Sequence, residues 1–289
     1  MNPADFTFIA ALLKDRSGLI ITPDKHYLLE TRLSPIVRER GLVDLAGLID
    51  ALRKPGSDVL KNKVVDAMTT NETSFFRDNH PFETLRKSVL PGLIERRASA
   101  KNLRIWSAAC STGQEPYSLA MMLKDSFPIL GNWKIDIVAT DISPSVLARA
   151  KEGVYSTFEV QRGMPIQMLI RHFDQVGETW RIKNELRGNI SFRPANLLED
   201  FSALGTFDII LCRNVLIYFD QPTKTRILNA MSRRLAGDGV LMLGGAESVL
   251  GLCEAFSSVS GLRGVYGHAG AQAKPTKPTW PAVALPVAS

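Results

Sequence analysis

Cysteine is scarce in this chain of 289 residues, and long apolar runs are missing. The three cysteines, Cys110, Cys212 and Cys253, are odd in number and lack C-x-x-C spacing, which excludes a disulfide scaffold and argues against structural zinc. No stretch of about 18 apolar residues is available to span a membrane. The N-terminus carries Asp5 and no basic region, unlike a signal peptide. We therefore expect a cytoplasmic protein with no metal site and no membrane insertion.

The charge of the chain is only mildly basic. It has 35 Lys+Arg against 29 Asp+Glu, a formal net charge of +6. A hydrophobic content of 45% is ample for a core and excludes disorder of the whole chain. The basic excess has two interpretations: solvated helix faces, or attraction to an acidic partner, either nucleic acid or an acidic protein surface.

Residues 3 to about 70 are predicted to form a small helical domain. Apolar residues recur there at helical spacing, and no Val/Ile alternation typical of strands occurs. Pro35 lies inside the second predicted helix, and because it lacks a backbone donor we expect a kink or a break there. Helix starts are predicted at Asn2, Thr22, Asp44 and Ser57 or Asp58.

From Asn102 onward, strands and helices alternate. Such alternation predicts β-α-β units and a mostly parallel sheet, an α/β fold. Residues 178–183 alternate in polarity and predict one arm of a small antiparallel insert. The strands are predicted at 103–109, 135–140, 190–193, 207–212 and 239–243, and the helices at 116–127, 144–150 and 223–235.

The first predicted strand runs into the turn C-S-T-G-Q-E-P-Y at 110–117 and then a helix. A strand, a tight turn and a helix N-terminus form the front of a nucleotide-type pocket. The turn is not G-x-G-x-x-G, because Gly113 is its one glycine. Glu115 adds a carboxylate that would repel a pyrophosphate and suits a cation.

Polar residues follow three further strands of the predicted sheet. Asp141 is placed either to hydrogen-bond ribose hydroxyls or, with Ser143, to cap the next helix. Asn196 is placed to meet an adenine edge, and Arg213 and Asn214 follow a later strand. Open α/β sheets bind ligands beyond the carboxyl ends of their strands, so these residues predict a ligand crevice.

The charge of this crevice bears on the cofactor. A turn that binds a dinucleotide needs several glycines and no charged side chain beside the phosphates, and this turn meets neither requirement. S-adenosyl-L-methionine has a cationic sulfonium, one ribose and no phosphate, and it fits Glu115 and Asp141 better. The residues therefore favour a Rossmann-like methyltransferase.

The segment T-T-N-E-T-S-F-F-R-D at 69–78 joins the helical part to the sheet part. One interpretation is a capping segment at a helix start. The other is a polar lid that presents Asn71, Thr73 and Arg77 to a cofactor.

Five motifs occur in order along the chain: T-T-N-E-T-S-F-F-R, S-A-A-C-S-T-G-Q-E-P-Y-S-L-A, A-T-D-I-S, N-L-L and C-R-N-V-L-I-Y-F-D. In these motifs the sequence resembles the CheR family, the chemotaxis receptor glutamate O-methyltransferases of bacteria. The resemblance extends from about residue 5 to residue 268. It implies a small N-terminal all-α domain, then a Rossmann-like class I S-adenosylmethionine-dependent methyltransferase domain with a small antiparallel β insert.

The resemblance also implies an activity. Methyl would pass from S-adenosyl-L-methionine to specific glutamates on the cytoplasmic helices of chemoreceptors, leaving S-adenosyl-L-homocysteine and a γ-methyl ester used in sensory adaptation. A basic face around Arg32, Arg38 and Arg40 would dock the acidic receptor helices, although Pro35 departs from the family's basic-rich run. The implied cofactor residues are Asn71, Thr73, Arg77, Glu115, Asp141, Asn196, Leu197, Arg213 and Asn214.

The chemistry asks for few catalytic groups. A glutamate side chain has a pKa near ~4.3, so it is already ionised at neutral pH and needs no general base. His80 and His172 are lone histidines and are expected to be structural. Arg77, Arg213 and Tyr218 are the candidates for orienting the incoming carboxylate. Tyr218 has core packing as its alternative, and Arg213 a structural ion pair.

Some members of the family hold a receptor C-terminal pentapeptide on their β-subdomain. The corresponding turn here, D-Q-V-G-E at 174–178, is short and has no Gly-rich insertion. We therefore expect this protein not to need such a tether.

Three other functions fit less well. A nucleic-acid methyltransferase would have an N-P-P-Y-type motif, an NAD enzyme would have more glycines, and a non-catalytic module would have lost Asp141 or Glu115. The chain is expected to divide into four parts. These are a helical receptor-docking domain at 1–70, a linker with cofactor contacts at 71–90, a methyltransferase domain at 91–269 with its β-subdomain at about 155–192, and a disordered tail at 270–289. Nothing in the sequence demands more than a monomer.

Overall fold

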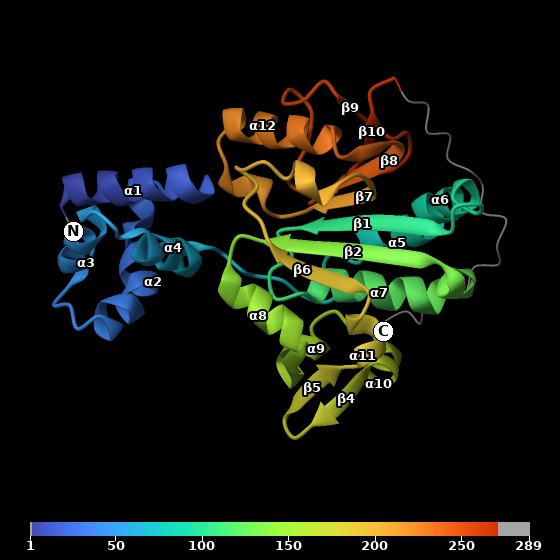
Figure 1. The fold of residues 1–289 in the computed structure, drawn as a ribbon, viewed down its shortest axis with the longest axis horizontal. Helices are drawn as coiled ribbons and strands as arrows, with labels where there is room; N and C mark the ends of the chain where they lie inside the picture. Colours follow the sequence, from blue (N-terminus) through green and yellow to red (C-terminus); the bar gives the residue numbers. More distant parts are fainter. Residues whose placement is uncertain (1, 271–289) are drawn as a thin grey trace.

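The structure is a computed structural model that describes residues 2–270. A bundle of helices α1–α4 lies at one end of the molecule and an α/β domain at the other, joined by a single extended segment (Figure 1). The predicted fold class is therefore confirmed. The tail from residue 271, with Trp280, lies outside the described residues.

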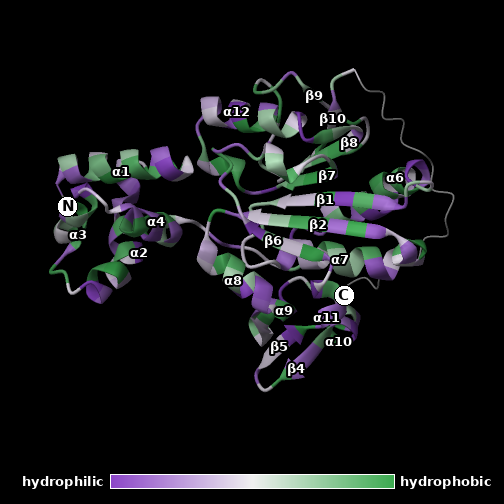
Figure 2. Ribbon diagram, in the orientation of Figure 1, coloured by the Kyte–Doolittle hydropathy of each residue, from purple (hydrophilic) through white to green (hydrophobic). Residues whose placement is uncertain are grey.

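The helical domain has its own apolar core. Leu13, Leu33, Leu48 and Val64, one from each helix, are fully buried together. Bands of hydrophobic and hydrophilic residues alternate along α1 (Figure 2). The helices are α1 (Pro3–Ser17), α2 (His26–Glu39), α3 (Leu45–Arg53) and α4 (Asp58–Met68), with a 3-10 turn η1 (Pro23–Lys25) before α2.

Two of the predicted helix starts carry the expected caps. The side chain of Asn2 accepts the backbone N–H of Asp5, and that of Asp44 accepts the N–H of Gly47. Ser57 precedes α4 without such a bond, because its hydroxyl donates to the carbonyl of Leu52.

The break predicted in the second helix at Pro35 does not occur. Helix α2 continues through Pro35 to Glu39. Pro35 is exposed, so the carbonyl that loses its helical donor there faces water rather than the core. The helix starts at His26, later than predicted, because residues 23–25 form the tighter turn η1.

The α/β domain is built on a seven-stranded sheet in the order β6-β2-β1-β7-β8-β10-β9. The first five of these strands pair in parallel, which confirms the mostly parallel sheet, and the last two pair antiparallel. Strand order reverses between β1 and β7, the place where such sheets open a ligand crevice. The strands are β1 (Asn102–Ala108), β2 (Lys134–Asp141), β6 (Ile190–Pro194), β7 (Phe207–Cys212), β8 (Leu235–Leu243), β9 (Phe256–Ser258) and β10 (Val265–His268).

Alternate side chains of the central strands enter two different cores, one on each face of the sheet. Ile105 and Ile209 belong to one, and Trp106 and Ile210 to the other. Both faces are therefore covered, as a parallel sheet requires. The covering helices are α5 (His80–Thr84), the π-helical turn η2 (Leu85–Val89), α6 (Leu90–Arg96), α7 (Gln114–Ser126), α8 (Pro144–Glu152) and α12 (Gln221–Ser232). Short 3-10 turns are η3 (Pro128–Asn132), η4 (Ser202–Leu204) and η5 (Leu216–Tyr218).

A second, three-stranded antiparallel sheet in the order β3-β5-β4 forms the predicted insert. Its strands β4 and β5 are joined by the two residues Gly177 and Glu178. Its elements are β3 (Val154–Ser156), α9 (Thr157–Gln161), α10 (Ile166–His172), β4 (Phe173–Val176), β5 (Thr179–Ile182) and α11 (Asn184–Arg187).

Two boundaries differ from the sequence prediction. The helix predicted over 223–235 ends at Ser232, and Leu235 is the first residue of β8. The stretch His80–Arg96 is helical throughout, so it crosses residue 90 without a break. Phe82 and Leu93 from this stretch lie in the same core as the sheet.

The two domains meet at the C-terminal end of α1. The amide nitrogen of Asn196 donates to the carbonyl of Arg16 at 2.8 Å, and the N–H of Ile20 donates to the carbonyl of Tyr218 at 3.2 Å. Lys14 forms a 2.9 Å ion pair with Asp220. These contacts hold the helical domain against the carboxyl ends of the central strands.

Candidate active site

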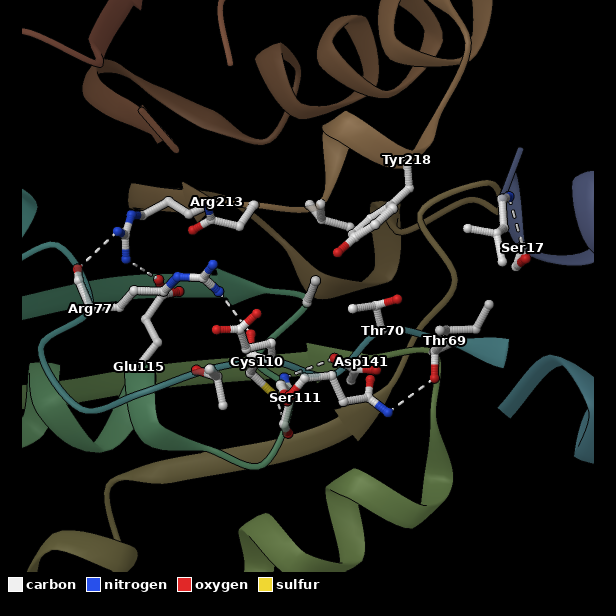
Figure 3. Close-up of a pocket in the computed structure, with 18 of the residues that line it drawn as sticks. Ser17, Thr69, Thr70, Arg77, Cys110, Ser111, Glu115, Asp141, Arg213 and Tyr218 are labelled. Atoms are coloured by element: carbon white, nitrogen blue, oxygen red, sulfur yellow. Dashed lines mark hydrogen bonds and ion pairs between the residues drawn. The ribbon is translucent and has the colours of Figure 1, made fainter. Parts of the chain in front are cut away.

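A cavity that is partly open to solvent lies at the carboxyl ends of β1, β2 and β7. Three parts of the chain meet there: the end of α1, the segment that joins the domains, and the loops after the strands (Figure 3).

The turn between β1 and α7 has an unusual backbone. Ala109, Ser111 and Gly113 all have positive φ, of 61°, 51° and 94°. Such conformations are costly for residues other than glycine and cluster at functional sites. A Cβ on Gly113 would lie 3.0 Å from the Cβ of Ala150, so α8 also packs too closely for a larger residue. The turn brings Cys110, Ser111 and Glu115 into the cavity wall.

Asp141 is buried at the end of β2 and holds this turn in place. Its Oδ2 accepts the backbone N–H of Ser111 at 2.8 Å, and its Oδ1 accepts that of Ser143 at 3.0 Å. Burial raises the pKa of Asp141, and the backbone donors act in the opposite direction. The cap of α8 is Ser143, whose hydroxyl accepts from Val146, so Asp141 is left to face the cavity.

The connecting segment crosses the opening between the domains. The backbone carbonyl of Asn71 accepts the hydroxyl of Ser111, and the backbone N–H of Phe76 donates to the hydroxyl of Ser118 at 2.9 Å. Phe76 and Asp78 have positive φ, of 49° and 67°, on either side of Arg77. The segment therefore lies on the turn after β1 and presents Asn71, Thr73 and Arg77 to the cavity.

Arg213 is the most constrained charge at the site. Its side chain is 2% exposed, Nη1 lies 2.9 Å from Glu115 Oε2, and Nη2 lies 2.8 Å from Asp78 Oδ2. Nη2 also donates to the carbonyl of Arg77, while Nε is buried with no partner among the described residues. Arg213 therefore forms the structural ion pair considered as an alternative above. The carboxylate of Glu115, which the sequence suggested would suit a cation, is paired at least in part with this guanidinium.

Tyr218 lies at the end of η5 and also lines the cavity. Its hydroxyl points into the cavity above the level of Asp141 and Thr70 (Figure 3). The side chain is partly exposed, which core packing alone would not require. Arg77 likewise remains partly exposed, with Nη1 donating to the carbonyl of Glu72 at 2.7 Å.

The structure brings together eight of the residues predicted from the sequence. Asn196 and Leu197 are not among the residues that line the cavity. Both functional groups of the Asn196 side chain are engaged elsewhere, Nδ2 with the carbonyl of Arg16 and Oδ1 with the N–H of Leu198. The eight that line the cavity are Asn71, Thr73, Arg77, Glu115, Asp141, Arg213, Asn214 and Tyr218.

Sequence reasoning missed the contribution of the helical domain. Ser17 and Leu19 line the cavity, although neither is among the site residues predicted from the sequence. Phe219 also lines it and lies within the I-Y-F-D motif, which is a signal for it. Gly18, between Ser17 and Leu19 in the sequence, approaches Phe219 so closely that a Cβ added to Gly18 would lie 2.8 Å from the Phe219 ring.

The other candidate groups have structural surroundings. His172 is fully buried, its Nε2 lies 3.0 Å from Asp125 Oδ1, and neither residue lines the cavity. Within residues 2–270, no group of three or more His, Cys, Asp or Glu is arranged to hold a metal ion. Over the same residues, no helix has both the length and the hydropathy to cross a membrane.

The donor set fits a cationic cofactor with an amino-acid end and a ribose. Arg213 pairs with both Glu115 and Asp78, whereas the carboxylate of Asp141 accepts only backbone N–H groups among the described residues. Thr70 and Thr73 also line the cavity, and Nε of the lining residue Arg213 is buried with no partner among the described residues. This fold and this site define a Rossmann-like methyltransferase that uses S-adenosyl-L-methionine.

Comparisons with known proteins identify the family. The all-alpha domain of the CheR methyltransferases matches residues 4–69, and their SAM binding domain matches residues 71–265. The chain belongs to the CheR methyltransferase family. It is 42% identical over 261 residues to chemotaxis protein methyltransferase 1 of Pseudomonas aeruginosa, covering 89% of this chain and 94% of that protein. It is 40% identical over 260 residues to chemotaxis protein methyltransferase Cher2 of Pseudomonas putida, covering 88% and 94%.

Proposed function

We propose that this chemotaxis methyltransferase is a protein-glutamate O-methyltransferase acting in the cytoplasm. It transfers methyl from S-adenosyl-L-methionine to specific glutamate side chains of chemoreceptors, forming the 5-O-methyl esters of sensory adaptation. The observation that supports this most is the cavity, where eight residues from four separate segments converge in a member of the CheR family.

The cofactor residues proposed include two that do not line the cavity, Asn196 and Leu197. The others, which line it, are Asn71, Thr73, Arg77, Glu115, Asp141, Arg213 and Asn214. When bound, S-adenosyl-L-methionine supplies the electrophilic methyl group. The protein's part is to hold the receptor carboxylate in line with it and to exclude water, and well-oriented pairs gain roughly 7–11 kcal/mol in this way. No proton has to be removed, because the glutamate is ionised at neutral pH.

Arg77 and Tyr218 are the residues proposed to orient the carboxylate. Both line the cavity, and both remain partly exposed. Arg213 also lines it, but its Nη1 and Nη2 are held by Glu115 and Asp78, so its proposed contribution is charge at a fixed position.

The receptor-docking face is proposed to lie on α2 of the helical domain, toward acidic receptor helices, with the protein acting as a monomer. Arg38 near the end of α2 and Arg40 directly after it are both exposed. Arg32 contributes less, because its guanidinium donates to the carbonyls of Met68 and Thr69. The linker that Arg32 holds is the one that carries the cofactor residues Asn71 and Thr73.

We further propose that no receptor pentapeptide tether is needed. The β4–β5 connection is only Gly177-Glu178. Titration with a receptor C-terminal pentapeptide should show no saturable binding at micromolar concentration. Tight binding would overturn this part of the proposal and leave the methyl transfer untouched.

The test of the function is transfer of radiolabelled methyl from S-adenosyl-L-methionine to membranes rich in chemoreceptors. Label on the receptor band, released as methanol by alkali, is the expected result and identifies a carboxyl methyl ester. The control is receptor whose candidate glutamates are replaced by alanine. No transfer by a protein that binds S-adenosyl-L-homocysteine would overturn the receptor as substrate.

A further inference from the structure

Glu247 lies in the loop after β8, outside the set of residues that line the cavity. Its carboxylate nevertheless accepts four backbone N–H groups. Oε2 accepts from Gly244 at 2.7 Å and Asn214 at 2.8 Å, and Oε1 accepts from Val215 at 2.9 Å and Leu216 at 2.7 Å. Three of these donors are consecutive residues of the loop after β7.

The backbone of that loop explains why it needs an anion. Asn214 has a positive φ of 57°, and Val215 follows with φ −126° and ψ −37°. This succession turns neighbouring N–H groups toward one point and makes a concave site for a negative charge. Here the anion is the Glu247 side chain, so the conformation is satisfied from within the protein.

The conformation of the loop after β8 places the Glu247 carboxylate against the backbone N–H groups of the loop after β7. The N–H of Glu247 donates to the carbonyl of Gly244, which closes a tight turn. A Cβ on Gly244 would lie 2.6 Å from Glu247 Oε2 and 2.9 Å from the backbone nitrogen of Asn214. Only glycine leaves room for this approach.

The loop that Glu247 holds carries much of one cavity wall. Arg213 precedes the three bonded residues and Tyr218 follows them, and Asn214 and Val215 line the cavity themselves. We propose that Glu247 is a positioning residue for methyl transfer. It fixes the loop 213–218 in its binding conformation before cofactor arrives, and so sets the positions of Arg213, Asn214 and Tyr218. This inference rests on the use of S-adenosyl-L-methionine described above.

The decisive variant is Glu247→Gln. A glutamine keeps the size of the side chain, but its amide nitrogen is a donor and would face backbone donors. The expected result is about a tenfold to hundredfold weaker Kd for S-adenosyl-L-homocysteine by calorimetry, with a similar loss of kcat. The matched control is Asp208→Asn, since Asp208 also accepts a backbone N–H, that of Arg104, at the opposite end of β7. It should lower Tm with the Kd unchanged.

Equal Kd and kcat in Glu247→Gln and wild type, with only Tm lowered, would overturn the proposal. Failure of the wild type itself to bind S-adenosyl-L-homocysteine would instead contradict the cofactor assignment. Hydrogen exchange on the wild type gives a test that needs no variant. The amides of Asn214, Val215 and Leu216 should be protected without cofactor, and exchange that slows only when cofactor is added would refute pre-positioning.

Discussion

Arg213 and Glu115 form a 2.9 Å ion pair that joins the end of β7 to the first turn of α7. Glu115 Oε1 also accepts the hydroxyl of Ser107, from β1. The pair therefore ties together the two strands between which the strand order reverses. It also keeps two nearly buried charges compensated at the cavity wall.

Replacing Glu115 by glutamine should weaken both the fold and the cofactor site. Arg213 would keep Asp78, which is 52% exposed, as its one carboxylate partner, and a buried charge with a poorer partner costs stability. We expect a loss of about 1–3 kcal/mol in unfolding free energy and a tenfold or greater rise in the Kd for S-adenosyl-L-homocysteine. Denaturant titration and calorimetry measure the two effects.

The control for that variant is Glu72→Gln. Glu72 also lines the cavity, but its carboxylate is 59% exposed and pairs with Arg162 on the surface. Exposed pairs contribute little. Glu72→Gln should leave stability and Kd unchanged within error, and a response as large as that of Glu115→Gln would refute the importance of the Arg213 pair.

Tyr218→Phe should separate turnover from cofactor binding. The hydroxyl points into the cavity, so its loss should lower kcat about tenfold or more and leave the Kd for S-adenosyl-L-homocysteine within twofold. Steady-state assays on receptor membranes measure kcat.

The matched control is Tyr117→Phe, at a fully buried tyrosine whose hydroxyl donates to the carbonyl of Ala150 at 2.7 Å. Burial raises the pKa of Tyr117 to about 12. Its loss should cost about 1 kcal/mol of stability with kcat unchanged at a temperature where the protein is folded. An unchanged kcat in Tyr218→Phe would assign Tyr218 to packing.

Much of this site is predictable because its residues follow strands with a clear sequence pattern. Residues 207–212 are apolar except for Asp208, and a parallel strand buried on both faces needs such a run. The amino-acid sequence alone therefore places Glu115, Asp141 and Arg213 at or just beyond strand ends. Their proximity follows from the topology.

What the sequence does not reveal depends on contacts between distant parts of the chain. Ser17 reaches the cavity only because Asn196 and Tyr218 bond the end of α1. Strands β9 and β10 are short, with three and four residues, so the sequence shows no alternation of polar and apolar residues that would predict them. Local propensity predicts an interruption of α2 at Pro35, and the buried face of that helix overrides it.

Lowering the pH should remove the contribution that the carboxylate of Asp238, in strand β8, makes to the free energy of unfolding. Hydrogen bonds from Arg97, and then from Arg96, lower the pKa of Asp238 from 3.8 to about 2. A carboxyl with a lowered folded-state pKa stabilises the protein above its unfolded pKa, and this contribution is lost as pH falls toward the folded value. Asp238 is 40% exposed, so solvent screening limits the contribution to about 0.5–1 kcal/mol.

The measurement is Tm against pH for wild type and Asp238→Asn. Wild type should be the more stable by a constant margin from pH 6 to 8, and the margin should shrink from pH 4 to 3. Asp15→Asn, at an exposed position on α1, should track wild type throughout. A margin that grows as pH falls would contradict the sign of this linkage.

The contact between Gly18 and Phe219 should couple the helical domain to the cavity. Gly18 has φ +75°, and a Cβ there would lie 2.8 Å from the Phe219 ring. Gly18→Ala thus adds a steric conflict to a left-handed backbone that itself costs roughly 1–2 kcal/mol for an alanine. Gly56→Ala isolates the backbone cost, because Gly56 has the same φ of +75° and nothing within 4 Å of the added atom.

We expect Gly18→Ala to lose more unfolding free energy than Gly56→Ala, and to weaken S-adenosyl-L-homocysteine binding several-fold, since Ser17 and Leu19 line the cavity on either side. Gly56→Ala should bind as wild type does. Denaturant titration and calorimetry on the two variants measure these effects. Equal losses of unfolding free energy and equal Kd values would mean that the Phe219 ring moves aside and that this contact does not couple the helical domain to the cavity. A weaker Kd confined to Gly18→Ala would make the position of the helical domain part of the cofactor site.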